Sequence, residues 1–490
     1  MRKKSLKRPI DISKLTPWQI LLLLCLVSVI LRFFSFFPSV IDHDESTYLE
    51  MAREMLEGKV LYVDVIDIKP PGIFLILSGF QLLFGYSIFF IRFLVTLWIA
   101  LTAFLIYSSG MILFNDKKAS VAGGIIYIFF ISTWSFYGIS ITPEIFFNLF
   151  TILALWVLLK NQTTWRYLVA GLIAGFGFIV KYFVMMDFAA FMLFFIFLKN
   201  YEAGKKPGFF RVTLQVALAG IGFALPFLVA NIYYYATGHF DAFVDMIYLA
   251  PARYPSAFQP WRIIRYTLDL HIRFFPVFFF FYYALFDKRL RNPRISETRR
   301  LIIPWAILAL FAVQLSGNNY GHYAIQFMLP VSLMAGLFFH SERPLPGMLG
   351  RFFHGRAWCI TLAILLILVA ALKLEYFFRH DKPREIAAYL EPKLKPADVI
   401  YTGNYHHIIY YLLKKDSPTP YIHRSLLTVP RHLHAFNIDQ EAEFSKIMEQ
   451  HPLYILTEKD YPPNTMKDFI NENYELEKDF GDKVLLWRRK

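Results

Sequence analysis

Charged residues and cysteines are scarce in this chain of 490 residues. Only 18% of the residues are Asp, Glu, Lys or Arg, whereas a soluble protein carries about 25%. The two cysteines, Cys25 and Cys359, both lie in apolar runs, which argues against a disulfide or a cysteine-bound metal. Internal repeats and low-complexity tracts are also absent. The sequence therefore does not look like a soluble globular enzyme or a solenoid.

Apolar residues are abundant instead, and they are clustered. Hydrophobic residues make up 56% of the chain, with 52 Phe, in runs of about 15 to 25, the length that crosses a hydrocarbon layer of roughly 30 Å as a helix. Transmembrane strands would alternate apolar and polar residues, and that pattern is missing. We therefore expect an α-helical polytopic membrane protein with about 11–13 transmembrane helices. The expected crossings are residues 16–37, 87–114, 119–138, 141–160, 164–180, 182–199, 212–236, 268–286, 300–316, 323–340 and 357–377.

Residues 72–85 decide the parity of these crossings. The segment holds about 14 mainly apolar residues, which is short for a span. If it does not cross, the number of crossings is odd and the two ends of the chain lie on opposite sides. If it does cross, Lys117 and Lys118 move to the outer face. The charges favour the first alternative.

The formal net charge of +14 belongs to the membrane part. Residues 381–490 hold 16 Lys and Arg against 17 Asp and Glu, so the rest holds 35 against 20. By the positive-inside rule this excess indicates cytoplasmic connections, not nucleic-acid binding. The N-terminus is thus expected in the cytoplasm, before an uncleaved first span in the cell (plasma or inner) membrane. The basic connections are residues 1–15, 115–118, 160–166, 199–211, 287–300 and 341–356.

The composition changes after about residue 378. We expect a transmembrane domain at 1–378 and a small soluble α/β domain at 379–490 on the outer (periplasmic or extracytoplasmic) side. Helices are predicted at 384–394 and 466–473, and strands at 398–401, 453–457 and 483–488.

The first outer loop, residues 38–71, is the most informative segment. Tyr48, Met51 and Met55 recur at helical spacing, opposite Glu50 and Arg53. This pattern predicts an amphipathic helix that lies at the membrane surface and ends at about residue 58.

Three acids, Asp42, Asp44 and Glu45, stand where this helix begins. Capping of the helix explains one of them. A functional alternative is that one carboxylate is a general base. A third alternative is a Mg²⁺ or Mn²⁺ site that uses Asp42 and Asp44, because oxygen ligands suit these ions.

The loop also resembles a known family. An Asp-Glu pair, a Tyr three residues later, an Ala-Arg-Glu-Met-Leu helix and then Asp-x-x-Asp-x-Lys-Pro-Pro are similar to the first outer loop of GT-C type glycosyltransferases that use lipid-linked sugars. The protein O-mannosyltransferase-like and lipid A aminoarabinose transferase-like enzymes are the nearest of these in pattern. Weaker similarity continues to about residue 330, and residues 379–490 add little.

The resemblance implies roles for particular residues. Asp44 matches the presumed catalytic base, with Glu45 beside it, and Lys69 matches a lysine expected near the donor phosphate. The matches elsewhere in the chain are a second acid, Glu144, a lysine inside a hairpin, Lys181, and a His-Tyr pair before a late span, His322 and Tyr323. His43 does not belong to the pattern.

Simpler explanations accompany several of these positions. Glu144 is also an ordinary helix-start acid, and Lys181 could reach a membrane interface from a span end. Arg253 suits forked contacts to phosphate, but equally an interfacial anchor. His406 and His407 are predicted to be packing or helix-start residues.

Together these features predict transfer of a sugar from a polyprenyl-phosphate donor to an acceptor hydroxyl at the outer face. The acceptor, whether glycan, lipid or protein, and the sugar are not specified by any motif. No cofactor is required by this chemistry, and a divalent metal is an open alternative. Two other classes remain: a lipid or oligosaccharide transporter or flippase without chemistry, and a membrane-embedded polymerase or ligase of glycans.

Overall fold

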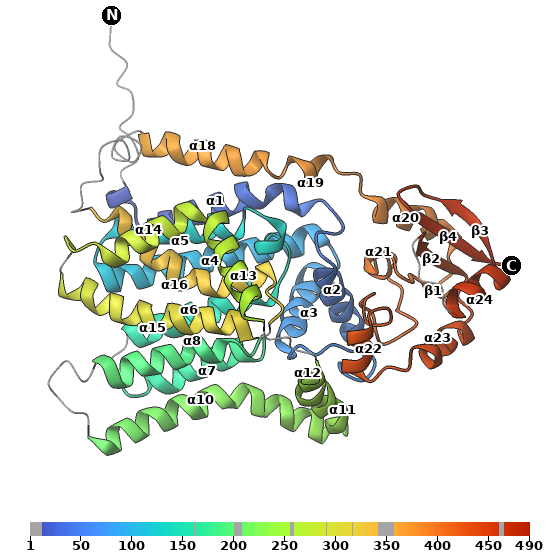
Figure 1. The fold of residues 1–490 in the computed structure, drawn as a ribbon, viewed down its shortest axis with the longest axis horizontal. Coiled ribbons are helices and arrows are strands. Elements are labelled where there is room, and N and C mark those ends of the chain that lie inside the picture. Colours follow the sequence, from blue (N-terminus) through green and yellow to red (C-terminus); the bar gives the residue numbers. More distant parts are fainter. Residues whose placement is uncertain are drawn as a thin grey trace, which may run out of the picture. The chain divides into compact units, whose positions relative to one another are not determined.

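The computed structural model describes residues 12–160, 163–199, 208–254, 259–290, 292–315, 317–341, 357–459 and 465–490. Its ribbon is drawn in Figure 1. The basic tail before residue 12 and most of the connections at 199–211 and 341–356 lie outside these residues. The chain forms two compact units. The first unit comprises Met1–Phe36, Arg92–Phe227 and Phe258–Phe377, and the second comprises Phe37–Ile91, Leu228–Ala257 and Phe378–Lys490.

Helices that suit a membrane dominate the first unit, and the protein is a multi-pass membrane protein. Among the described residues, six helices are long and apolar enough to cross, and two bent pairs raise this number to eight. The six are Pro17–Phe36 (α1 with η2), Ile88–Phe114 (α4), Pro143–Lys160 (α6), Phe209–Ala236 (α10), Pro293–Leu315 (α15) and Gly321–Phe339 (η6, α16 and η7).

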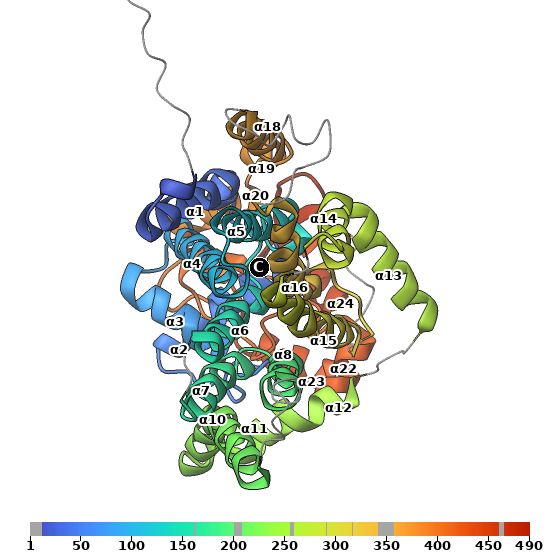
Figure 2. The same cartoon turned by 90° about the vertical axis from the view of Figure 1, so that its left-hand side faces the viewer.

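One helix lies at the centre of the first unit. Every residue of α16 (Ala324–Gly336) is buried. The helix packs against α5 (Lys117–Ile131), α6, α14 (Phe275–Phe286) and α15. Figure 2, which looks along many of the helices, shows α16 among these neighbours. Because lipid tails are as apolar as leucine, such burial reflects close packing between helices more than escape from water.

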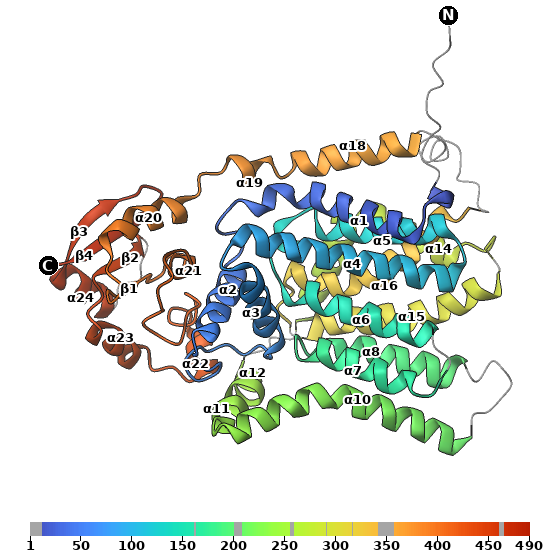
Figure 3. The same cartoon turned by 180° about the vertical axis from the view of Figure 1, so that it is seen from behind.

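Glycines bring α10 and α7 (Arg166–Phe178) into close contact, side by side in Figures 1 and 3. A Cβ built on Gly171 would lie 2.3 Å from the carbonyl oxygen of Ala219, and one on Gly222 would lie 2.2 Å from that of Leu168. Only glycine permits backbones to approach this closely. This is the packing by small residues that is frequent between transmembrane helices.

Residues 268–286, predicted as one crossing, are not one straight helix. The helices α13 (Pro260–Arg273) and α14 (Phe275–Phe286) meet with a bend of 94°. Pro276 lies in the first turn of α14 and cannot donate the backbone hydrogen bond that would continue α13. The pair counts as one span only if the bend is included, so the crossing at 268–286 stays a prediction.

Several other predicted crossings are short helices. The segments Arg166–Phe178 and Val184–Leu198 are apolar but shorter than 18 residues, so the count of eleven crossings stays a prediction. The disputed segment 72–85 forms α3 (Gly72–Phe84). At 1.5 Å per residue its 13 residues extend about 20 Å, which is too short for a hydrocarbon layer of about 30 Å.

The C-terminal part of the second unit is a small α/β fold. Its four strands are β1 (Ile400–Tyr401), β2 (Tyr454–Glu458), β3 (Tyr474–Asp479) and β4 (Val484–Arg489), in the sheet order β1-β2-β4-β3. The pair β1–β2 is parallel and the other two pairs are antiparallel. The predicted soluble α/β fold is confirmed, and the predicted strands correspond to β1, β2 and β4.

The helices of this part were predicted less completely. The two predicted helices correspond to α20 (Lys382–Leu390) and α24 (Thr465–Asn473). Strand β3 and three further helices were missed, namely α21 (Ile408–Leu413), α22 (Pro430–Phe436) and α23 (Gln440–Glu449).

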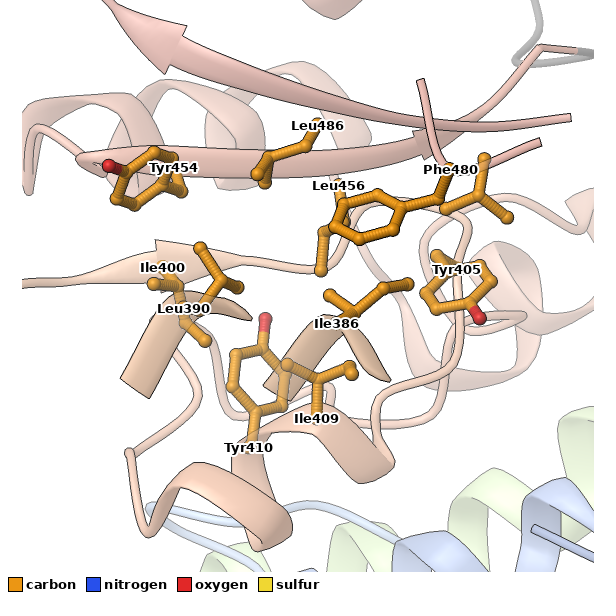
Figure 4. Close-up of a cluster of buried hydrophobic side chains, with 11 residues drawn as sticks. Ile386, Leu390, Ile400, Tyr405, Ile409, Tyr410, Tyr454, Leu456, Phe480 and Leu486 are labelled. Carbon is orange, nitrogen blue, oxygen red and sulfur yellow. The ribbon is translucent and has the colours of Figure 1, made fainter. Parts of the chain in front are cut away.

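One face of this sheet is covered by α20 and α21. Figure 4 shows Ile386 and Leu390 of α20 beside Tyr410 of α21, under the side chains of Leu456 and Leu486 from the strands. These five side chains have no more than 1% of their surface exposed. Each buried aliphatic side chain contributes about 1.5–3 kcal/mol, so this cluster stabilises the C-terminal fold.

Candidate functional site

The first-loop helix, α2 (His43–Leu56), begins with the three acids. Asp42 is the N-cap residue, and its side chain accepts a hydrogen bond from the backbone N–H of Asp44 at 2.8 Å. Asp44 and Glu45 lie in the first turn. Capping thus accounts for Asp42 and leaves the other two acids to be explained.

The polar face of α2 is buried, contrary to the prediction of an amphipathic helix on a surface. Glu50, Arg53 and Glu54 have at most 1% of their surface exposed. Arg53 donates to both carboxylate oxygens of Glu50, at 3.1 and 2.7 Å, and to Asp416 at 3.0 Å. Glu54 accepts from the backbone N–H of Ser417 at 2.9 Å. Residues 415–417, some 360 positions further along the chain, therefore cover this face.

The apolar face of α2 packs on α3. The side chains of Gln81 and Ser78 donate to the backbone carbonyls of Leu49 and Ala52, at 2.8 and 3.1 Å. Both faces of α2 are thus fixed within the second unit, which makes the start of the helix a rigid support for Asp44 and Glu45.

Replacing Arg53 with Met is expected to destabilise the second unit by about 3–5 kcal/mol, because it leaves the buried Glu50 carboxylate without a partner. Thermal unfolding in detergent would measure the effect. Lys446→Met is a matched control, because Lys446 also forms an ion pair with a residue three positions away, Glu443, but its side chain is 69% exposed. This substitution should lower the free energy of unfolding by less than about 1 kcal/mol. Arg53→Met with Glu50→Met should recover much of the loss. An unchanged stability in Arg53→Met would contradict the importance of this network.

Asp44 contacts Tyr48 and His423 and remains accessible. Its Oδ2 atom accepts from the Tyr48 hydroxyl at 3.2 Å, and its Oδ1 atom lies 3.4 Å from Nε2 of His423. The Asp44 side chain is 36% exposed, whereas Glu45 is 1% exposed. Of the two neighbouring acids, Asp44 is therefore the one that a substrate can reach.

Lys69 contacts the tyrosine that donates to Asp44. Its Nζ atom lies 5.0 Å from the centre of the Tyr48 ring, and the Tyr48 hydroxyl donates to Asp44. Asp67 holds the lysine through contacts of 3.3 and 3.4 Å, and the Tyr62 hydroxyl donates to its backbone carbonyl at 2.7 Å. The structure thus brings together Asp44, Glu45 and Lys69, as the sequence predicted.

Arg253 of α12 (Ala250–Arg253) makes anchoring contacts. Its Nε atom donates to the carbonyl of Ala435 at 2.9 Å, and one terminal nitrogen pairs with Asp245 at 2.8 Å. These contacts fix the guanidinium within the second unit, and the role of a membrane-interface anchor stays a prediction. A phosphate role for Arg253 stays a prediction.

Histidines that the sequence did not assign to the site surround the start of α2. The ring of His43 stacks on that of His406 at 4.6 Å and lies 6.0 Å from that of His407. His407 hydrogen-bonds to the Thr47 hydroxyl at 2.9 Å and to the His43 carbonyl at 3.1 Å. The packing role predicted for His406 and His407 is confirmed, but the partner, His43, was not foreseen. Their spacing of more than 360 residues leaves no local signal for this contact.

Burial keeps these imidazoles neutral. Burial, with His406 and Arg424 nearby, lowers the pKa of His43 to about 3. Burial and Arg424 lower the pKa of His406 to about 4, and burial also lowers the pKa of His407. The pKa of Asp42 moves the other way, to about 6, because the carboxylate is buried and lies near Asp44.

Acid is therefore expected to destabilise the second unit. The histidine pKa values lie below the ordinary 6.5, so the unfolded chain binds more protons, and stability present above about pH 6.5 is lost as the pH falls toward 4. Three carboxyls oppose this, because the raised pKa values of Asp42, Glu50 and Glu54 favour the fold in acid. Four histidines of the unit have lowered pKa values, His432 being the fourth, so the histidines outnumber the carboxyls. Unfolding midpoints measured from pH 7 to pH 4 should fall. His406→Phe should flatten the slope, and His434→Gln, at an exposed position, should leave it unchanged. A flat wild-type profile would contradict this account.

A second group of predicted residues meets in the first unit. Lys181 forms an ion pair with Glu144, the first-turn acid of α6. Its Nζ atom lies 3.9 Å from the centre of the Tyr323 ring, and that ring lies 4.7 Å from His322. Glu144 is fully buried and the Lys181 side chain is 13% exposed. Lys181 is thus directed at an acid and an aromatic ring inside the unit, not extended from a span end.

A buried carboxylate that the sequence analysis did not single out supports this group. Asp187 of α8 (Val184–Met192) accepts from Trp305 and from Gln326, both at 2.7 Å. Gln326 also donates to the carbonyl of Phe183 at 2.9 Å. These bonds connect the hairpin of Lys181 to α16, which directly follows Tyr323.

The candidate residues therefore form two groups, one in each unit. Asp44, Glu45, Lys69 and Arg253 belong to the second, and Glu144, Lys181, His322 and Tyr323 belong to the first. Within the described residues, no group of three or more His, Cys, Asp or Glu side chains is arranged to hold a metal ion. A Mg²⁺ or Mn²⁺ ion at Asp42 and Asp44 stays a prediction.

Part of the chain is similar in sequence to known glycosyltransferases. Residues 68–229 match the family described as dolichyl-phosphate-mannose-protein mannosyltransferase. A curated relative, the undecaprenyl phosphate-alpha-4-amino-4-deoxy-L-arabinose arabinosyl transferase of Photorhabdus laumondii subsp. laumondii, is 30% identical over 161 residues. The aligned part covers 29% of this chain and 28% of that relative.

Similar solved structures cover far more of the chain. ArnT from Cupriavidus metallidurans, solved bound to undecaprenyl phosphate, has a TM-score of 0.62 at 14% identity, over 95% of this chain and 97% of its own. The oligosaccharyltransferase AglB from Archaeoglobus fulgidus has a TM-score of 0.51 at 13% identity, over 98% of this chain and 75% of its own. The family match and the shared fold confirm the resemblance of this chain to the GT-C type glycosyltransferases.

Proposed function

We propose that this protein is a membrane glycosyltransferase that moves a sugar from a polyprenyl-phosphate donor to an acceptor hydroxyl. The observation that carries the proposal is the accessible Asp44 carboxylate at the start of α2. Tyr48, which donates to this carboxylate, also has Lys69 against its ring. The family match over residues 68–229 and the fold of a protein solved with undecaprenyl phosphate support the same chemistry.

In this mechanism Asp44 takes the proton of the acceptor hydroxyl as the oxygen attacks the anomeric carbon. The bond from that carbon to the phosphate oxygen breaks, and the electron pair leaves with the polyprenyl phosphate. Cations stabilise the charge that develops on the phosphate. Each unit offers candidates for this role, Lys69 in the second unit and Lys181 with His322 in the first. A phosphate leaving group needs no proton at neutral pH, so one base suffices. Direct displacement inverts the anomeric centre, unlike the two-carboxylate retaining hydrolases.

The location is part of the proposal. The positive-inside rule assigns the basic connections to the cytoplasm, which puts the first loop and residues 379–490 at the outer face of the cell (plasma or inner) membrane. Tagging of the C-terminus and of the loop near residue 290 with an impermeant reagent would test this orientation.

The activity is tested with membranes that contain the protein, a labelled polyprenyl-phosphate sugar and extracts of cell-surface glycan, lipid and protein. Labelled acceptor together with released polyprenyl phosphate supports the proposal. Movement of the donor across the membrane without bond cleavage would favour a transporter instead. Repeating the assay with EDTA, and then with added Mg²⁺ or Mn²⁺, tests the metal.

A further inference from the structure

A group that contacts Asp44, the imidazole of His423, comes from the C-terminal part of the chain. His423 lies between α21 and α22, with Nε2 at 3.4 Å from Oδ1 of Asp44. The Tyr48 hydroxyl donates to the other oxygen, Oδ2, at 3.2 Å. Two groups on two different oxygens define the plane of the carboxylate, which a single contact cannot do.

The proton on His423 has a defined place. The backbone N–H of Ser425 donates to Nδ1 of His423 at 3.2 Å, and the Ser425 hydroxyl lies 2.7 Å from the same nitrogen. A backbone amide is always a donor, so Nδ1 is the acceptor of the neutral ring and the proton is on Nε2. Nε2–H therefore faces the Asp44 carboxylate. In this state His423 can donate to Asp44 but cannot accept a proton at Nε2 from a substrate.

The segment that carries His423 is itself held in place. Arg424 donates to the Asn404 carbonyl and to Glu458 of β2, both at 3.1 Å. The Ser425 carbonyl contacts Nδ1 of His432 at 3.0 Å. The His423 ring also packs 5.4 Å from that of His407 and is 21% exposed. A ring fixed by the sheet and by a neighbouring histidine can hold another side chain in one orientation.

We propose that His423 is a positioning residue for Asp44, so that the C-terminal α/β part completes the catalytic site. The inference rests on the proposed function, in which Asp44 is the base. Through its Nε2 contact with Oδ1 at 3.4 Å, His423 restricts rotation of the carboxylate, so that Asp44 meets the acceptor hydroxyl in one orientation. The alternative is that His423 serves only to pack the C-terminal segment.

The test is transfer by the purified full-length protein with a labelled polyprenyl-phosphate sugar and its acceptor. His423→Phe keeps a ring but removes the donor, and should lower kcat about 10–100-fold, as loss of an orienting partner does elsewhere, with the KM for the donor lipid within about twofold. His423→Gln carries an amide N–H at a similar reach and should stay within about fivefold of wild type.

The matched control is His432→Phe, which removes contacts with Tyr254 and Ser425 in the same segment but none with Asp44. It should leave kcat within about twofold of wild type, and unfolding midpoints of all variants report folding. Three outcomes would overturn this inference and leave the proposed function standing. They are a wild-type kcat in His423→Phe, equal losses of kcat in His423→Phe and His423→Gln, and a loss of kcat in His432→Phe equal to that in His423→Phe. No turnover by the wild-type protein would overturn the proposed function and this inference together.

Discussion

Replacing Asp44 with Asn is expected to lower kcat about 10²–10⁴-fold, the usual contribution of a general base. The amide keeps the shape of the side chain and can still accept from Tyr48, but it cannot take the proton of the acceptor. Because Asp42, not Asp44, caps α2, the helix should form normally. Membrane insertion and the unfolding midpoint are expected to stay at wild-type values.

A matched control lies in the same loop. Asp64 accepts from the backbone N–H of Val60 at 2.7 Å, so Asp64→Asn changes a loop carboxylate with a local structural contact. It should retain transfer within about threefold, as expected for a surface substitution. Full activity in Asp44→Asn would remove Asp44 as the base. In that case Glu45, buried beside it, becomes the next residue to test.

What surrounds the candidate site residues could not be read from the sequence. The acids of the first loop, Lys69, Glu144 and Lys181 were singled out through the resemblance to the GT-C type glycosyltransferases, and their roles stay predictions. The contacts that hold these residues were not predicted. Arg53 looked like part of a water-facing helix side because its partner, Asp416, lies more than 360 residues away. Period-3.6 patterns report which residues share a face and not what covers that face.

The same limit explains the elements that were missed. Strand β3 has the sequence YELEKD and is exposed along most of its length, so hydrophobic alternation is weak. Its pairing with β4 depends on the turn at Gly481, where φ is +73°. A single glycine in a sequence does not by itself identify a hairpin turn. The bend between α13 and α14 was signalled by Pro276, but the aromatic run after it, FPVFFFFYY, favoured one continuous span.

Replacing Lys181 with Met is expected to lower kcat/KM for the donor lipid about 10²–10³-fold, the effect of removing one group that stabilises charge in the transition state. Lys160→Met is the control, since Lys160 also ends near an aromatic ring, 4.5 Å from the centre of Trp156, but is exposed at the end of α6. It should stay within about twofold of wild type.

A second effect accompanies the loss of Lys181, because Glu144 is fully buried and would be left unpaired, at a cost of about 3–5 kcal/mol in stability. The double variant with Lys181→Met and Glu144→Gln separates the two roles. If Lys181 only neutralises Glu144, the neutral pair should restore both stability and activity. If the lysine also binds the donor phosphate, the double variant should regain stability while its transfer activity stays low. In that case Lys181→Arg should retain more activity than Lys181→Met or the double variant, because the arginine keeps a cation against the phosphate. Recovery of wild-type transfer in the double variant would assign Lys181 to the fold of the first unit and remove it as a phosphate ligand.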